Sequence, residues 1–316
     1  MIKAICTTTV NSPTEAIKKF IKIAHDQDWI FYIVGDLKTP HEEYHKLEDE
    51  RVKYLSPEYQ MNKYPELSEA IGWNCIQRRN IGFIEAYKAG AGIIYTCDDD
   101  NIPLDNWGKN VCVNKEASID IFQVDSEVFE PLAVTNLRDI WHRGFPIQLL
   151  NDDKRFPSYE SIKKNISVLV QADLWNGNPD VDAICRISRS AVEDGFDDQL
   201  ILNNKPYSSN KISPFNSQNT FLSRKLFPTY FLFPHIGRFD DIWAAYITQH
   251  YFPNSVIYGP PTVFQDRNEH DLVKDLEQEL FGYKWTYKLI QDLDNWQKYL
   301  PERSLLAYEA YKKEFA

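Results

Sequence analysis

The sequence predicts an α/β protein built on a Rossmann-like, mostly parallel central sheet with helices on its faces. In the first hundred residues, apolar runs alternate with stretches whose apolar residues recur at helical spacing. One such run, residues 29–34 (WIFYIV), is apolar throughout, as in a strand that is buried on both faces. This alternation is typical of doubly wound sheets, whose ligands bind beyond the carboxyl ends of the strands.

The elements of the first hundred residues can be assigned in order. A helix is expected to begin near residues 12–15, where SPTE combines an N-cap residue, an early proline and an acidic first turn. A second helix is expected at 78–88. Strands are expected at residues 3–9, 29–34, 52–55 and 92–97.

The rest of the chain is less regular. A β-rich piece is expected at 118–123 and a helix at 159–172. The polar stretch 206–219 is expected to be an active-site loop, because apolar runs resume on both sides of it. A further helix begins at residue 240. The tail, 271–316, is expected to be helical, with an aromatic packing face.

Composition excludes several classes of function. The 316 residues carry a formal net charge of −11, and no basic cluster is present to track nucleic-acid phosphates or an anionic membrane. No apolar run is long enough for a membrane span, and the N-terminus lacks a signal-peptide core. The five cysteines form no C-x-x-C pair and are expected to be reduced. We therefore expect a soluble, cytoplasmic protein with no nucleic-acid partner; its oligomeric state stays open.

The strongest motif is DDD at 98–100, directly after the apolar strand 92–97. Three adjacent carboxylates repel one another, and a divalent cation such as Mn²⁺ or Mg²⁺ relieves that repulsion while binding diphosphate oxygens. Alternate residues of an extended segment point the same way, so Asp98 and Asp100 can share a metal while Asp99 points elsewhere. The alternative is an acidic surface turn.

A second motif, RRN at 78–80, opens a helix. Arg78 and Arg79 at a helix N-terminus form a local anion site within an acidic protein. Asp36 and Lys38 follow the strand 29–34, so we expect a nucleotide pocket in which Asp36 holds a base or ribose and Lys38 or Arg78 a phosphate. The alternative is a solvated basic pair.

A third motif is the acidic pair Asp240 and Asp241, at the start of a helix. One of the two carboxylates can cap the helix. The other can act as a general base toward an acceptor hydroxyl.

Taken together and in order, eight segments across residues 30–270 resemble the STELLO-type glycosyltransferase-like family. More distantly, they resemble the reversibly glycosylated polypeptides, which include UDP-arabinose mutases. STELLO proteins carry membrane-anchoring N-terminal regions, whereas this chain starts almost at its first strand, so their Golgi role is not transferred. The segments are VGDLKTP at 34–40, YLS at 54–56, RNIG at 79–82, IYTCDDDN at 94–101, RGFP at 143–146, DVDA at 180–183, PFNSQNT at 214–220 and RFDDIW at 238–243.

The resemblance implies a GT-A fold whose D-x-D motif binds a divalent metal and the donor diphosphate. It implies a domain at 1–270, with a nucleotide-binding half at 1–105 and an acceptor half at 106–270, followed by a helical extension at 271–316. By position, the metal ligands would be Asp98, Asp100 and His270, and the catalytic carboxylates would be Asp241, as base, and Asp240. The nucleotide-sugar site would contain Thr8, Asp36, Lys38, Arg78, Arg79, Asp98 and Asp99. The acceptor or sugar side would contain Asp180, Asp182, Asn216 and Gln218.

The function expected from the sequence is metal-dependent transfer of a sugar from a UDP-linked donor to a glycan or other hydroxyl acceptor, with inversion if Asp241 is the base. One alternative is a UDP-sugar mutase that glycosylates itself on an arginine such as Arg143 or Arg186. Another is a nucleotide-sugar-binding module without turnover.

Overall fold

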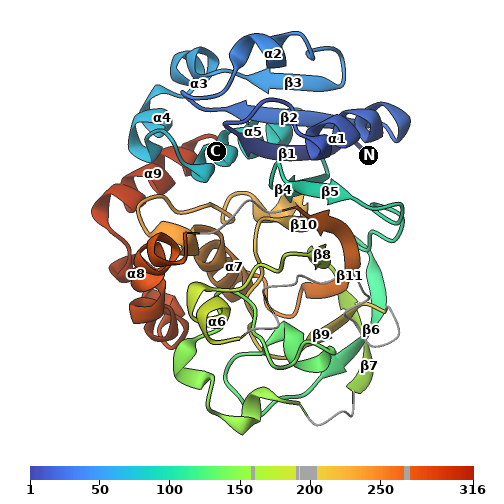
Figure 1. Ribbon diagram of the computed structural model, residues 1–316, viewed down its shortest axis with the longest axis vertical. Coiled ribbons are helices and arrows are strands. Elements are labelled where there is room, and N and C mark those ends of the chain that lie inside the picture. The colour runs from blue at the N-terminus through green and yellow to red at the C-terminus, as the bar shows by residue number, and fades with distance from the viewer. Residues whose placement is uncertain (158–160, 190–191, 193–204, 267–270) are drawn as a thin grey trace.

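The α/β prediction is confirmed by a computed structural model, which describes residues 1–157, 161–189, 192, 205–266 and 271–316. In this described part, eleven strands form one sheet with helices packed around it (Figure 1). The strand order is β3-β2-β1-β4-β10-β8-β11-β9-β6-β7, and β5 pairs with β11 off this path. This arrangement is a GT-A-like fold.

The first half of the chain forms the parallel end of the sheet. Strand β1 pairs in parallel with β2 and β4, and β2 pairs in parallel with β3. The chain moves outward from β1 to β3 and then returns to the other side of β1, which creates a topological switch point between β1 and β4. The elements are β1 (Lys3–Thr9), α1 (Glu15–Asp26), β2 (Trp29–Gly35), α2 (His41–His45), β3 (Val52–Leu55), α3 (Pro57–Lys63), α4 (Pro65–Ile71), α5 (Arg79–Lys88), β4 (Ile93–Cys97) and β5 (Asn101–Pro103).

Local sequence explains these boundaries. The N-cap of α1 is Thr14, whose side chain accepts a hydrogen bond from the Ile17 backbone, so the cap lies two residues beyond Ser12 and the helix begins at Glu15. The buried face of α1 includes Ile17 and Phe20, at helical spacing. The predicted strands of this half all form, because each apolar run is covered on both faces.

The second half joins the sheet through β10. This strand pairs antiparallel with both β4 and β8, while β11 runs parallel to β8. As a result, β8 and β11 point in the same direction as β1, β2 and β4. The elements are β6 (Glu116–Phe122), β7 (Ser161–Ser167), β8 (Val170–Gly177), α6 (Ala183–Ser188), β9 (Tyr207–Ser209), β10 (Asn219–Ser223), α7 (Asp240–Tyr251) and β11 (Val256–Gln265).

The helix expected at 159–172 is wrong. Ser161–Ser167 forms β7 and pairs antiparallel with β6, and Val170 begins β8. Ile162 and Ile166 are four residues apart, a spacing that fits one face of a helix and equally one face of a strand. Cross-strand pairing with Ile121 and Ala117 decided in favour of the strand.

The tail forms α8 (Leu272–Ile290) and α9 (Glu302–Lys313), as the sequence predicts, and the two helices run along one side of the molecule (Figure 1). Helix α9 contacts both halves of the fold. Lys313 pairs with Glu66 of α4 at 2.7 Å, and the Tyr311 hydroxyl donates to the Tyr230 carbonyl at 3.0 Å. The tail is therefore packed onto the sheet domain.

Two further observations concern the whole described chain. All five cysteines are free thiols. Within the described ranges, we find no helix whose length and apolar character would let it cross a membrane.

Candidate functional site

The carboxyl ends of β1, β2, β4, β8 and β11 lie at one edge of the sheet, because these strands share one direction. Asp36 follows β2, and residues 98–100 follow β4. Gln265, the last residue of β11, donates from its side-chain amide toward Asp100. Ligands of open α/β sheets bind outside this edge, so the predicted residues gather where the fold favours a site.

Asp98 is held by Arg79. The Arg79 Nη2 lies 2.6 Å from Asp98 Oδ1 and 3.3 Å from the Thr8 hydroxyl. Arg79 is 1% exposed, while the side chain of Asp98 is 33% exposed. Burial lowers the pKa of Arg79, but the Asp98 charge and hydrogen bond outweigh burial and raise it. Arg79 is thus a buried cation that orients a partly exposed carboxylate.

The other two carboxylates of the triplet diverge. Asp99 Oδ2 accepts hydrogen bonds from the Thr9 hydroxyl at 2.5 Å and from Asn11 Nδ2 at 3.0 Å, and burial raises the pKa of Asp99. Asp100 faces Gln265, whose Nε2 lies 3.3 Å and 3.4 Å from the two carboxylate oxygens. Asp99 is therefore hydrogen-bonded to the end of β1 and to the segment after it, whereas Asp100 contacts the last residue of β11.

A second buried cation, Arg143, lies between two carboxylates. Its Nη1 and Nη2 each lie 3.0 Å from an oxygen of Asp241, and its Nε lies 3.0–3.1 Å from both oxygens of Asp180. Its Nη1 also donates to the Arg238 carbonyl. All three side chains are buried, so Arg143 is a buried cation shared by two buried carboxylates.

Ser217 joins the two arginine clusters. Its carbonyl accepts a hydrogen bond from Arg79 Nη1 at 3.0 Å, and its backbone N–H donates to Asp241 Oδ2 at 2.9 Å. Its hydroxyl lies 3.2 Å from both partners. Ser217 lies in the loop that leads into β10, so one polar network continues from Asp98 to Asp180.

Asn216 and Gln218 extend this network. Asn216 Nδ2 donates to Asp180 Oδ2 at 2.7 Å and to Gln218 Oε1 at 3.2 Å. Gln218 Nε2 is buried without a hydrogen-bond partner in the described part of the chain. A buried hydrogen-bond donor without a partner costs folding free energy. Gln218 is next to Asn219, which pairs with Cys97, the residue before Asp98.

Asp240 has a different environment from Asp241. Its Oδ2 accepts a hydrogen bond from Gln77 Nε2 at 2.9 Å. Burial, followed by the charge of Asp241, raises the pKa of Asp240 to about 7. Asp241 accepts hydrogen bonds from Arg143 and Ser217. The adjacent carboxylates thus have different partners: Asp240 is bound by a neutral amide, and Asp241 by a cation and a serine.

Several predicted residues are placed away from the network. Arg78 donates five hydrogen bonds, to Gln60, Ser68 and Gly72, and stacks on Trp73. Its guanidinium is therefore engaged by α3, α4 and the turn after them, and the phosphate-binding role expected from the sequence is replaced by a structural one.

Asp182 also has a structural position. It caps α6 by accepting from the Cys185 backbone at 2.8 Å, and its other oxygen accepts from Trp141 Nε1 at 2.6 Å. Burial raises its pKa to about 7. The sequence placed Asp182 on the sugar side, but its carboxylate is turned into the packing of α6.

The remaining predicted residues flank the site. Asp36 is 3% exposed and accepts backbone hydrogen bonds from Leu37 at 2.6 Å and Cys75 at 3.1 Å. Lys38 is exposed at the end of the β2 turn. His270 lies outside the described residues.

Sequence reasoning missed Ser217, Gln77 and Gln265, and it assigned Arg143 only as a possible target of self-glycosylation. Arg143 is buried and engaged by two carboxylates, so its guanidinium is not an accessible nucleophile. A pattern signal existed for Ser217, which lies inside the motif PFNSQNT. Nothing in the sequence distinguished the buried amides of Gln77 and Gln265 from solvated ones.

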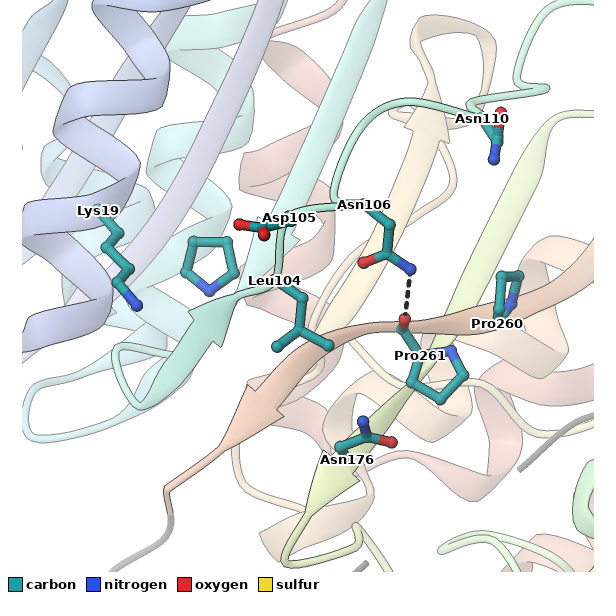
Figure 2. A pocket seen from close by; sticks show the side chains of 9 residues that line it. Lys19, Leu104, Asp105, Asn106, Asn110, Asn176, Pro260 and Pro261 are labelled. Atoms are coloured by element: carbon teal, nitrogen blue, oxygen red, sulfur yellow. Dashed lines mark hydrogen bonds between the residues drawn. The ribbon is translucent and has the colours of Figure 1, made fainter. Parts of the chain in front are cut away.

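A separate cavity of about 570 Å³ is lined by residues of α1, β5, the segment after β5, β8 and β11 (Figure 2). Its lining includes Pro103, the last residue of β5, and none of the predicted site residues. The Asn106 amide closes one side by donating to the Pro261 carbonyl at 2.9 Å. The lining residues are Lys19, Pro103, Leu104, Asp105, Asn106, Asn110, Asn176, Pro260 and Pro261.

The donor set at the triplet fits a divalent cation that completes its shell with substrate and water. Among the described residues, no three His, Cys, Asp or Glu side chains are gathered as a metal cluster. Mg²⁺ and Mn²⁺ commonly take one or two carboxylates together with phosphate oxygens. Asp98 and Asp100 are the carboxylates that could take this role, and the buried Gln265 Oε1 has no partner in the described chain.

Fold and site together define a GT-A-like α/β protein with a carboxylate-rich site at the ends of parallel strands. No known protein-family profile matches the chain. Two curated Arabidopsis thaliana proteins are similar to it: "Probable glycosyltransferase STELLO1", 22% identical over 213 residues, and "Probable glycosyltransferase STELLO2", 24% identical over 208 residues. The resemblance to STELLO-type glycosyltransferases is thereby confirmed.

Each alignment covers 62% of this chain and 26% of the relative. The chain thus spans about a quarter of the length of the relatives it matches. What those longer proteins do as a whole is not carried over.

Proposed function

We propose that the protein is a metal-dependent glycosyltransferase that uses a nucleotide-sugar donor, UDP-linked, and a hydroxyl acceptor on a glycan or small molecule. The observation that carries this proposal is the continuous network at the strand ends, from Asp98 through Arg79 and Ser217 to Asp241 and Arg143. It joins an acidic, partly exposed end to the buried carboxylate Asp241, whose neighbour in the chain is Asp240.

On the donor side, Asp98 and Asp100 would hold Mn²⁺ or Mg²⁺, which stabilises the charge on the leaving diphosphate. Arg79 acts on Asp98 by fixing its orientation, because its Nη groups are already engaged inside the protein. Asp36 and Lys38 border the nucleotide end of the site, with Lys38 the exposed cation.

On the acceptor side, Asp240 fits the role of general base better than Asp241. A base works best when its pKa lies near the operating pH, and the pKa of Asp240 is raised to about 7. Asp241, which the sequence favoured, accepts two hydrogen bonds from Arg143 and two from Ser217. Asp241 then acts as the anchor that keeps Arg143 and Ser217 in position.

With Asp240 as base, a single displacement with inversion at the anomeric carbon is the expected course. Asn216 and Gln218 lie between the donor end and Asp180 and can hydrogen-bond sugar hydroxyls. The unpartnered Gln218 Nε2 supports this assignment, because a ligand oxygen would satisfy it.

The test is a donor screen followed by Asp240→Asn. UDP- and GDP-sugars are incubated with the protein, Mn²⁺ and glycan acceptors, and nucleotide release and product are measured. We expect a UDP-sugar to be consumed and the rate to rise with pH through about 7, because the base must lose its proton first. In Asp240→Asn, turnover should fall by about 10²–10⁴-fold.

Asp105→Asn is the matched control, since it neutralises an exposed carboxylate that lies two residues after β5 and outside the network. It should keep the parental rate. Near-parental turnover in Asp240→Asn would exclude that residue as the base. No consumption of any nucleotide sugar, with or without metal, would contradict the proposed activity. Ring conversion of the sugar without an acceptor would indicate a mutase instead.

A further inference from the structure

We propose that Gln265 is a cation-dependent ligand at this site: its side-chain amide donates to Asp100 when no metal is bound, and turns to present Oε1 when a divalent cation is bound there. The inference rests on the proposed metal dependence and deepens it. It concerns a residue that lies outside the acidic triplet.

The position of Gln265 is fixed by its backbone. It ends β11 and is paired with Asn101 of β5 on one side and with Gly177 of β8 on the other. A Cβ on Gly177 would lie 2.5 Å from the Gln265 carbonyl oxygen, so the two strands approach as closely as only glycine permits. Its main chain is therefore rigid, and the amide at the end of the side chain is the part that can turn.

The contact between Gln265 and Asp100 is weak in its present form. Nε2 lies 3.3 Å and 3.4 Å from the two oxygens, longer than the usual 2.9–3.0 Å of an N–H···O bond. A single amide nitrogen is shared between both carboxylate oxygens. Each of the two contacts is therefore weaker than a single well-aligned hydrogen bond.

The other atom of the amide is unsatisfied. Gln265 is 2% exposed, and its Oε1 has no hydrogen-bond partner among the described residues. The Asn178 side-chain oxygen, on the residue after β8, is likewise buried and unpartnered there. The Asn178 backbone N–H donates to the Gln265 carbonyl at 3.2 Å, so two unsatisfied amide oxygens belong to neighbouring strand ends, and one of them is on the residue that contacts Asp100.

An excess of hard oxygen acceptors is the chemistry of a Mg²⁺ or Mn²⁺ site. Rotation of the amide about its last side-chain bond exchanges Oε1 and Nε2. Without a cation, the Asp100 carboxylate would repel an amide oxygen, so the Nε2 group of Gln265 faces the carboxylate. With a cation, the Asp100 carboxylate and Gln265 Oε1 can both bind the metal ion, and Oε1 then has a partner.

The test measures Mn²⁺ binding directly, by the loss of the free-ion electron paramagnetic resonance signal, with and without UDP. In Gln265→Met, which keeps the length and removes both amide atoms, we expect the Mn²⁺ dissociation constant to rise at least tenfold. The matched control is Gln171→Met, because Gln171 also donates to a buried carboxylate, that of Asp173, but both of its amide atoms are satisfied. Gln171→Met should bind Mn²⁺ as the parent does.

A second variant keeps the proposal testable if Gln265→Met does not fold. Gln265→Glu places a carboxylate beside Asp100, so it should melt at a lower temperature than the parent without metal and gain more thermal stability from Mn²⁺. Parental affinity in Gln265→Met, or a Mn²⁺-induced shift in Gln265→Glu no larger than the parent's, overturns the inference.

These outcomes are distinct from failure of the proposed function. If the parent binds Mn²⁺ and Asp100→Asn abolishes binding while Gln265→Met does not, the metal site stands and the role of Gln265 falls. If the parent binds no Mn²⁺ even with UDP, the proposed metal dependence fails, and the role of Gln265 fails with it.

Discussion

Replacing Arg143 by methionine should destabilise the protein strongly, because this one side chain neutralises two buried carboxylates. Its nitrogens lie 2.9–3.1 Å from oxygens of Asp180 and Asp241. Removing one partner of a buried ion pair costs about 3–5 kcal/mol. We expect the upper part of this range, since Arg143 pairs with two buried carboxylates rather than one.

The expected change in melting temperature follows from the size of the chain. At about 2.1 cal/mol/K per residue, 316 residues have an unfolding entropy of roughly 0.66 kcal/mol/K. A loss of about 3–5 kcal/mol then lowers the melting temperature by roughly 5–8 °C. Differential scanning calorimetry at pH 8 measures this shift.

The control is the triple variant Asp180→Asn, Arg143→Met, Asp241→Asn, which removes all three charges. Asn216 and Ser217 can still donate to the new amide oxygens, so most of the lost stability should return. A single variant within about 1 kcal/mol of the parent at pH 8, or a triple variant no more stable than the single one, would refute the reasoning.

Two more predictions concern packing and buried charge. Gly282→Ala should cost about 1–3 kcal/mol, because its Cβ would lie 2.1 Å from the Phe239 ring; calorimetry measures the cost, and a parental melting temperature would mean that α8 does not press on Phe239. Asp173→Asn should lose less stability than the parent between pH 5 and pH 8, since burial raises the Asp173 pKa to about 7 and the folded state pays for ionising it as pH rises. Equal losses in urea titrations at the two pH values would contradict this assignment.

The sequence predicted the elements of the first half well, because their strands are continuous apolar runs that only a doubly covered sheet can bury. The helix predicted at residues 159–172 was wrong for a physical reason: apolar residues four apart fit one face of a helix and one face of a strand. Only the partner strand β6, about forty residues away, decides between them.

The site was predictable to a similar depth. The edge that carries Asp98 and Asp100 follows from strand direction alone. The difference between Arg78 and Arg79 does not, since neighbouring residues on a helix point about 100° apart and only the tertiary fold shows which one faces the strand ends. Likewise, the choice between Asp240 and Asp241 depends on Arg143, which is about a hundred residues distant.

Strand β10 has a consequence for the synthesis of the protein. It completes the pairing of β4, but the ribosome reaches it about 120 residues after β4 ends. At about 5–20 residues per second, the apolar edge of β4 waits roughly 6–24 s for its neighbour. Such an edge is a template for wrong pairing. A nascent chain halted between the two strands should therefore be the form that most needs a chaperone.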